Sequence, residues 1–175
     1  MLRPATPDDA AALVAIVVEG FEGYRAFTPA GWEPPAGHDD EAAMRERLAA
    51  ADTWCAIAEV GGEIAGHAAF LPAAVAREPV PDPRLAHLWQ LFVRRPFWGG
   101  GAARALHGAA VDAAVARGFA TMRLFTPAGQ GRARRFYERE GWAMSGPPRE
   151  DAALRMPIVE YRLVLPAPPP GSVAA

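Results

Sequence analysis

The chain has 175 residues, 51% hydrophobic and 22% charged, which suits one domain with a substantial core and excludes wholesale disorder. Its 18 basic residues are all Arg and its 20 acidic residues bring the formal net charge to −2, so we expect no general affinity for nucleic acid. A lone cysteine, Cys55, excludes a disulfide framework and a cysteine-based zinc site, and no apolar run is long enough to span a bilayer.

The first part of the chain predicts an edge strand, two helices and a β-hairpin. Its opening residues carry acids where a signal peptide is apolar, so we expect a cytoplasmic protein. Apolar residues recur at helical spacing after a cap at Thr6 or Asp8, and Gly61-Gly62 predicts a hairpin turn. The expected strands are residues 2–3, 53–60 and 63–73, the helices run to about Phe21 and over 39–51 from a cap at Asp39 or Asp40, and a long irregular loop covers 24–38.

The remainder alternates strands with helices. The near-continuous apolar run 85–93 predicts a central strand, and a glycine-rich turn leads from it into an Ala-rich helix that Gly118 ends. A single domain is therefore expected over 1–165, with a mixed α/β fold, followed by a Pro-rich tail over 166–175 that we expect to be disordered. The other expected elements are the helices 102–117 and 129–140, the latter closed by Gly141, and the strands 120–126, 142–145 and 156–165.

The charge is distributed unevenly. Nine Arg and two acids lie between Arg94 and Arg139, a local charge of +7, whereas the rest of the chain carries −9. A concentrated positive segment in an acidic protein indicates a local site for a polyanion.

The turn PFWGGGAARAL, residues 96–106, lies inside this positive segment. Glycines allow the backbone to approach a ligand closely, and the free amides at a helix start favour phosphate. The turn matches neither the P-loop nor the dinucleotide-binding pattern, because Arg104 occupies the last position of the latter and no Gly-Lys-Ser/Thr follows. A plain tight turn remains the alternative.

Two motifs together resemble the GNAT superfamily of acyl-CoA-dependent N-acetyltransferases. The segment LFVRRPFWGGGAARAL, 91–106, matches its apolar strand followed by Q/R-x-x-G-x-G/A, and QGRARRFYEREGW, 130–142, matches N-x-R-A-x-x-F-Y-x-x-x-G-F/W. The opening LRPATPDDAAAL is also similar. Two departures stand out: Trp98 replaces the usual Gln or Arg, so its side chain cannot serve a phosphate, and Gln130 replaces the frequent Asn.

The resemblance implies a mostly antiparallel sheet of about six to seven strands flanked by about four helices, with splayed central strands that hold acetyl-CoA. Main-chain groups of Leu91 and Val93 would pair with the pantetheine arm, and an amide near Phe92 would stabilise the oxyanion. The implied cofactor-binding residues are Leu91, Phe92, Val93, Trp98, Gly99, Gly100, Gly101, Ala102, Ala103, Arg104, Gln130, Arg134 and Tyr137, with Arg94, Arg95 and Arg135 as further counter-charges to the phosphates.

Tyr137 is the expected general acid, because a tyrosine hydroxyl stays protonated at neutral pH and can protonate the departing thiolate. Its alternative is an ordinary packing role. His87 is the candidate general base, since it alternates along its strand with Trp89, Leu91 and Val93. A buried structural histidine is an equal alternative, and Glu19 and Glu22 acting through water are competitors.

The other titratable residues predict no catalytic role. We expect His67 and Cys55 to be structural and His38 and His107 to lie at the surface, and we expect no metal site. The acceptor would lie near the first helix and its loop, where the candidates are Glu22, Tyr24, Phe27 and Trp32, unless these aromatics simply cover the sheet. The resulting expectation is direct acetyl transfer to the primary amine of a small molecule in a ternary complex. The alternatives are a non-catalytic acyl-CoA sensor and a protein N-terminal acetyltransferase, and the resemblance also allows for a homodimer.

Overall fold

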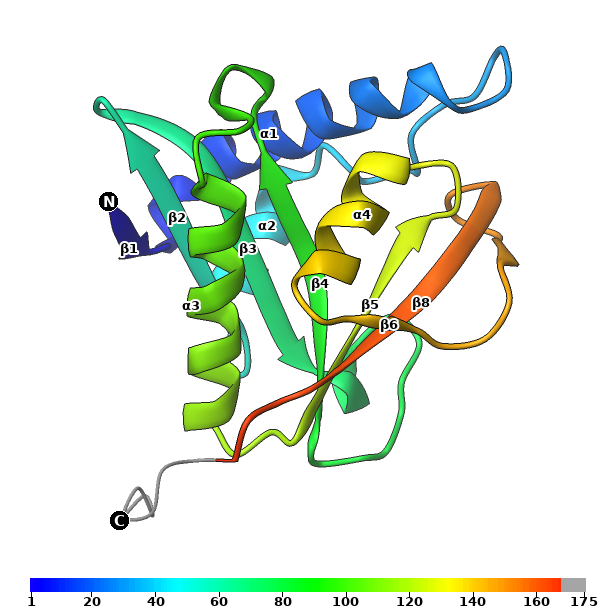
Figure 1. The fold of residues 1–175 in the computed structure, drawn as a ribbon. Helices are drawn as coiled ribbons and strands as arrows, with labels where there is room; N and C mark the ends of the chain where they lie inside the picture. The colour runs from blue at the N-terminus through cyan, green and yellow to red at the C-terminus, as the bar shows by residue number, and fades with distance from the viewer. Residues whose placement is uncertain (168–175) are drawn as a thin grey trace.

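The computed structural model describes residues 1–167, so nearly all of the predicted tail lies outside the described residues. In this part of the chain, eight strands form one sheet in the order β1-β2-β3-β4-β5-β8-β6, with β7 also paired to β8. Helices α1 and α2 lie behind the sheet in Figure 1, and α3 and α4 lie in front of it. The strands are β1 (Leu2–Pro4), β2 (Trp54–Val60), β3 (Glu63–Pro72), β4 (Leu85–Val93), β5 (Thr121–Pro127), β6 (Ala143–Met144), β7 (Arg149–Asp151) and β8 (Met156–Val164), and the helices are α1 (Ala10–Glu22), α2 (Glu41–Ala49), α3 (Ala102–Ala116) and α4 (Gly131–Arg139).

The predicted mixed sheet, its four helices and the central place of β4 are confirmed, and the boundaries differ by a few residues. Asp40 is the cap of α2, since its carboxylate accepts a hydrogen bond of 2.9 Å from the amide of Ala43. A short 3-10 turn, Pro7–Asp9, precedes α1, and Thr6 forms its capping box with Asp9. Strand β7 was not expected, because its charged and mostly exposed residues show no strand pattern.

The pairing of β4 with β5 is the one parallel contact among the described strands, and it is short. Only Leu85, Ala86 and His87 pair with β5, opposite Thr121, Met122 and Arg123. Beyond His87 the two strands diverge, while β4 remains paired with β3 as far as Val93. The predicted splay of the central strands is therefore confirmed, and the edge of β4 that faces β5 is left without a strand partner.

A β-bulge at Trp89 changes which face each β4 residue occupies. Leu88 pairs with Phe70 and Gln90 pairs with Ala69, so Trp89 is one extra residue in β4. Leu88 and Leu91 pack in the same core on the side of α3 and α4, whereas Trp89 packs against the α1 cluster. The expectation that His87 shares a face with Leu91 and Val93 is therefore wrong, because the bulge reverses the alternation between them.

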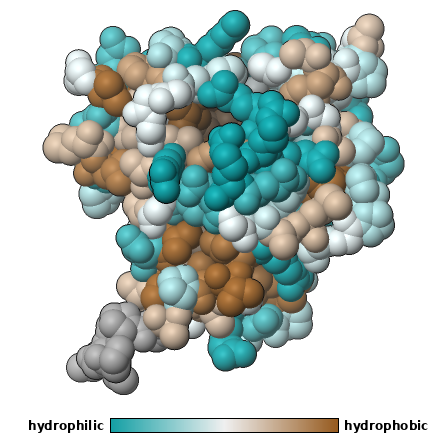
Figure 2. Space-filling view, viewed as in Figure 1, coloured by the Kyte–Doolittle hydropathy of each residue, from teal (hydrophilic) through white to brown (hydrophobic). Residues whose placement is uncertain are grey.

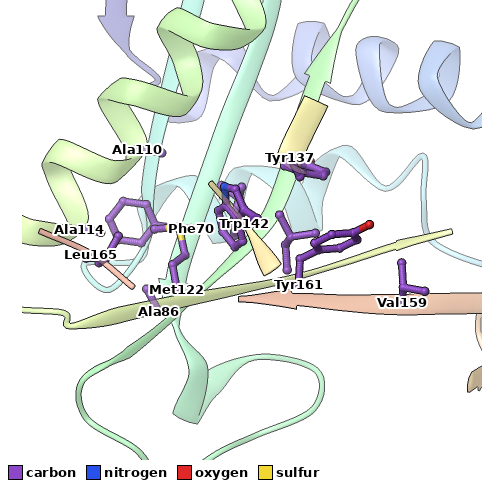
Figure 3. Close-up of a cluster of buried hydrophobic side chains, with 12 residues drawn as sticks. Phe70, Ala86, Ala110, Ala114, Met122, Tyr137, Trp142, Val159, Tyr161 and Leu165 are labelled. Carbon is purple, nitrogen blue, oxygen red and sulfur yellow. The ribbon is translucent and has the colours of Figure 1, made fainter. Parts of the chain in front are cut away.

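The larger core lies between the sheet and helices α3 and α4. Tyr137 of α4 lies above Tyr161 of β8, their ring centroids 6.2 Å apart, and Trp142 packs beside them (Figure 3). His107, expected at the surface, is buried. Burial is tolerated because its Nε2 accepts a 2.8 Å hydrogen bond from the indole nitrogen of Trp142. This pair joins α3 to the end of α4.

Two glycines bring neighbouring backbone close to β4. A Cβ placed on Gly66 of β3 would lie 2.3 Å from the carbonyl oxygen of Phe92 and 2.9 Å from Cα of Val93. A Cβ on Gly20 of α1 would lie 2.3 Å from the Phe92 ring. The position of the diverging half of β4 is thus fixed from β3 and from α1.

We predict that Gly66→Ala lowers the free energy of unfolding by about 1–3 kcal/mol, because the new methyl group meets backbone that cannot rotate away. Gly108→Ala is the control: Gly108 lies inside α3 and a Cβ there meets nothing within 4 Å. This control should raise stability by about 0.5–1 kcal/mol. Urea denaturation measures both, and equal effects of the two substitutions would contradict the close approach of β3 to β4.

Candidate active site

A cavity of about 80 Å³ occupies the gap between β4 and β5. Leu91 and Phe92 of β4 and Tyr137 of α4 contribute to its wall, together with Tyr24, which follows α1. The strand predicted to bind the cofactor, the helix that carries Tyr137 and the loop that carries Tyr24 therefore meet at this cavity. The lining residues are Tyr24, Leu88, Trp89, Gln90, Leu91, Phe92, Leu124, Phe125, Thr126, Gln130, Ala133 and Tyr137.

Val93 is not part of this wall. Its carbonyl oxygen accepts a hydrogen bond of 2.7 Å from the indole nitrogen of Trp98. The Arg94 amide donates to the Ala65 carbonyl of β3, so the main-chain groups of Phe92, two residues earlier, also face β3, and those of Leu91 and Val93 lie on the edge of β4 that faces β5. The Phe92 side chain is packed against α1, where its ring lies 6.1 Å from that of Phe21.

Tyr137 presents a protonated phenol to the cavity. The residue is 8% exposed, and burial, with the nearby Tyr24 phenol, raises the pKa of Tyr137 well above its ordinary value. Burial likewise raises the pKa of Tyr24. Both hydroxyls therefore carry their proton throughout the neutral range and can act as hydrogen-bond donors there.

Two glutamines of the wall are held by neighbours. The Gln130 side-chain oxygen accepts a 3.1 Å hydrogen bond from the Thr126 hydroxyl. The Gln90 side-chain oxygen lies 2.8 Å from Nε2 of His67, whose pKa burial lowers to about 4. The neutral His67 ring donates to this oxygen, which leaves the amide NH₂ group of Gln90 as the donor that is free to face a ligand. Gln90 was not predicted as a site residue.

The glycine turn offers free amides at the start of α3. Among residues 99–103, the Gly100 amide donates to the Phe97 carbonyl at 3.3 Å, whereas those of Gly99, Gly101, Ala102 and Ala103 have no protein acceptor in the described structure. Gly99 and Gly101 have φ of +81° and +86°, and a Cβ on either would meet nothing within 4 Å. The turn is therefore an open cradle of amides, as phosphate requires.

The arginines of the positive segment have different surroundings. Hydrophilic side chains gather over α4, which is rich in Arg (Figure 2). Arg134 nevertheless donates to the Tyr161 hydroxyl and the Ala128 carbonyl, both at 3.1 Å. Arg94 pairs with Glu19 at 3.0 Å, and Arg104 lies 3.8 Å from Glu140 with 81% of its side chain exposed. Arg95 and Arg135 are exposed.

His87 lies outside the cavity wall, where β4 and β5 are still paired. It is buried beside Phe125, with ring centroids 5.2 Å apart, and its Nδ1 has no hydrogen-bond partner in the described structure. Burial, with Arg123 and Arg77 nearby, lowers the pKa of His87 to about 3. The structure therefore does not bring the candidate base to the other site residues.

The competing carboxylates are held by arginines. Glu19 accepts from Arg94 and, at 3.4 Å, from the amide of Arg95, and Glu22 accepts from Arg25 at 2.8 Å. Neither glutamate is part of the cavity wall.

The aromatic residues expected around the acceptor form a packed cluster. Trp32 is 5% exposed and its indole nitrogen donates to the Leu154 carbonyl at 2.7 Å. Phe27 packs on Tyr24, with ring centroids 5.2 Å apart. Of this group only Tyr24 reaches the cavity wall, and the others hold it in place.

A wider surface hollow, about 380 Å³, lies at the β1 edge of the sheet. Its wall includes β1 and the start of β2 but no residue of either sequence motif. Cys55 lies there, and burial raises the pKa of its thiol to about 12, so it is a poor nucleophile at neutral pH. We place the candidate active site in the smaller cavity, because the motif residues meet there.

The residues present fit coenzyme A on two observations. The free amides of the glycine turn suit phosphate, and the indole nitrogen of Trp89, a wall residue, is a buried donor without a partner in the described structure.

No helix among the described residues is long and apolar enough to cross a membrane. No group of three or more potential ligand side chains is placed for a metal ion there either.

We predict that stability falls as the pH decreases from 6.5 to 5. His67 and His87 have folded pKa values of about 4 and about 3, so in this range these two side chains take up protons mainly in the unfolded chain. Each of the two histidines should lower the free energy of unfolding by at most about 1.4 kcal/mol per pH unit. Its contribution to stability is full above the unfolded pKa of about 6.5 and is lost as the pH falls below that value. Because burial also lowers the pKa of His107, urea denaturation at several pH values should show a shallower slope in His87→Phe that does not vanish, and an unchanged slope would mean that His87 titrates normally in the folded protein.

The comparisons with known proteins agree with this geometry. The sequence model described as the acetyltransferase (GNAT) family matches residues 18–142. No curated protein sequence matches the chain.

Many solved structures share the fold. The structure of yncA from Salmonella typhimurium, with its cofactor acetyl-CoA, is 19% identical with a TM-score of 0.71 and covers 98% of both chains. The PaiA N-acetyltransferase of Thermoplasma acidophilum, in complex with coenzyme A, is 13% identical with a TM-score of 0.71 over 91% of this chain and 96% of that one. A ribosomal-protein-alanine N-acetyltransferase from Brucella melitensis is 19% identical with a TM-score of 0.71 over 94% and 99%. Since the family pattern matches most of the chain and the fold is shared along it, the protein belongs to the GNAT family of acetyltransferases, which use acetyl-CoA.

Proposed function

We propose that the protein transfers the acetyl group of acetyl-CoA to the primary amine of a small molecule by direct attack in a ternary complex. The observation that carries this proposal is the place of Tyr137 in the wall of the gap between β4 and β5, where burial raises the pKa of its phenol. Acetyl-CoA, when bound, supplies an acetyl thioester. A cytoplasmic location and a homodimer stay predictions from the sequence.

Tyr137 is proposed as the general acid. The departing thiolate needs a proton, and a nearby phenol can donate a hydrogen bond to the sulfur as its negative charge develops and then supply that proton. Because the phenol of Tyr137 has a raised pKa, it is in the acid form whenever the enzyme works near neutral pH. The amide that stabilises the negative charge is proposed to lie near Phe92, whose main chain lies close to Gly66 and whose ring lies close to Gly20.

The wall favours an uncharged amine. Its side chains are apolar, amide, hydroxyl or phenol groups, so an ammonium ion that entered would lose its hydration without meeting a counter-charge. The amine is therefore proposed to lose its proton before it reaches the thioester. His87 remains the predicted base only if its replacement alters the pH dependence of the rate, since its ring lies outside the wall.

A small acceptor is favoured over a protein segment by the size and closure of the site. The cavity is narrow, and the cluster of Trp32, Tyr24 and Phe27 closes the side next to α1. Tyr24 is proposed to contact the acceptor, whereas Glu22 is exposed and paired with Arg25.

The function is tested by incubating the protein with acetyl-CoA and a panel of small amines while free thiol is measured. We expect thiol release that depends on the amine. Release only with peptides would indicate an N-terminal acetyltransferase, and binding of acetyl-CoA without release for any amine or peptide would indicate a sensor.

Tyr137→Phe should lower kcat about 100-fold or more, because the general acid is lost while the ring still packs. Tyr161→Phe is the matched control, since this neighbouring tyrosine hydroxyl donates to Glu138 at 2.7 Å and lies outside the cavity wall. It should keep kcat within a few-fold. Because the pKa of Tyr137 is raised, the wild-type rate should show no alkaline decline up to pH 9.5, and unchanged turnover in Tyr137→Phe would refute the role.

A further inference from the structure

Trp98 and Arg132 join the two sides of the cleft at its open end. Trp98 follows β4 in the turn before α3, and Arg132 lies in the first turn of α4, which follows β5. The guanidinium carbon of Arg132 lies 3.9 Å from the centroid of the Trp98 ring. This contact links segments that are 34 positions apart in the sequence, between the ends of the two diverging strands.

The indole is a fixed platform. Its nitrogen donates to the Val93 carbonyl at 2.7 Å, and the Trp98 amide donates to the Arg95 carbonyl at 3.1 Å. Trp98 is nevertheless 47% exposed, which is unusual for so large an apolar side chain. An exposed aromatic surface that is anchored at its polar edge suits the stacking of a cation.

Arg132 keeps its charge available. Within the described residues it has no carboxylate partner, unlike Arg94 and Arg104, which lie near Glu19 and Glu140. Stacking uses the flat face of the guanidinium and leaves the N–H donors along its edge free to bind a planar or tetrahedral anion. The stack on Trp98 thus fixes the guanidinium group of Arg132 without neutralising its charge.

We propose that Arg132, held on the indole of Trp98, binds the pyrophosphate of coenzyme A opposite the free amides of Gly99, Gly101 and Ala102. Trp98 stands where the motif that the sequence resembles has Gln or Arg, and in this proposal it compensates by positioning an arginine from α4. Arg132 is a cofactor-binding residue in this account and Trp98 is a positioning residue. The inference depends on the use of coenzyme A and not on the identity of the acceptor.

The test measures the Kd of three ligands by calorimetry without any acceptor: coenzyme A, dephospho-coenzyme A, which lacks the 3′-phosphate, and pantetheine, which lacks every phosphate. Arg132→Gln should weaken the binding of coenzyme A and of dephospho-coenzyme A by about tenfold or more, since a charge-assisted bidentate contact is lost. The binding of pantetheine should not change. Arg139→Gln is the control, because it removes the same charge from an exposed position of α4 and should leave all three Kd values within about twofold.

The platform is tested separately. Trp98→Phe keeps an aromatic face and should weaken coenzyme A binding less than Trp98→Ala does. In the Arg132→Gln background, Trp98→Ala should have little further effect, because the indole acts through the arginine. Thermal unfolding confirms that each variant is folded, and the binding of pantetheine shows that the rest of the cleft is intact.

Three results would overturn the proposal. Equal coenzyme A affinity in Arg132→Gln and Arg139→Gln would show that Arg132 does not bind phosphate. If Arg132→Gln weakens the binding of coenzyme A and of pantetheine equally, the stack of Arg132 on Trp98 is only a structural link between α4 and the turn. If Arg132→Gln weakens the binding of coenzyme A but not that of dephospho-coenzyme A, Arg132 binds the 3′-phosphate instead of the pyrophosphate.

Discussion

The parallel pairing between β4 and β5 ends after three residue pairs, and the functional geometry depends on that termination. Backbone N–H and C=O groups require hydrogen-bond partners, and the β4 edge that faces β5 has lost its neighbouring strand beyond His87. A ligand with amide groups can take the place of that strand. The gap is held open from both sides: β3 and α1 approach β4 through Gly66 and Gly20, and Tyr137 packs over Tyr161 on the side of β5 and β8.

The same divergence separates two kinds of chemistry. Inside the cleft the wall is uncharged and its phenols are protonated, which suits a thioester and a neutral amine. At the open end, free amides and the stacked Arg132 suit phosphate. In the proposed arrangement, charge is thus concentrated where the phosphates of the cofactor would bind and is kept away from the proposed place of the reacting atoms.

The positive segment of the sequence is less uniform in the fold than its net charge indicates. Arg134 holds Tyr161, and Arg94 holds Glu19, so these guanidinium groups mainly stabilise the structure. Arg123 is buried and its pKa is lowered by the loss of hydration. A charge count along the chain therefore indicates the segment in which the phosphate site is proposed but does not indicate which arginine is free to bind phosphate.

Most of the fold could be predicted because the signals are local. The Gly61-Gly62 turn, the apolar run of β4 and the glycine turn before α3 each act within a few residues. Tyr137 could be placed in the site because its motif includes its own helix.

The bulge at Trp89 could not be predicted, because one extra residue leaves an apolar run unchanged while it reverses the faces on either side. For this reason His87 was assigned to the wrong face. The pairs His107–Trp142 and Trp98–Arg132 were missed for a related reason, since both join residues more than thirty positions apart. Strand β7 could not be predicted either, because its residues are charged and it is a strand only through its pairing with β8.

Hydrogen–deuterium exchange with and without coenzyme A tests the central claim most directly, since it reports which backbone amides the cofactor covers. If coenzyme A binds between β4 and β5, exchange should slow in residues 91–93 and 99–103 and remain unchanged in residues 2–5 and 53–56, which line the wider hollow. Protection of the hollow, with unchanged exchange in β4 and the glycine turn, would contradict the assignment of the site.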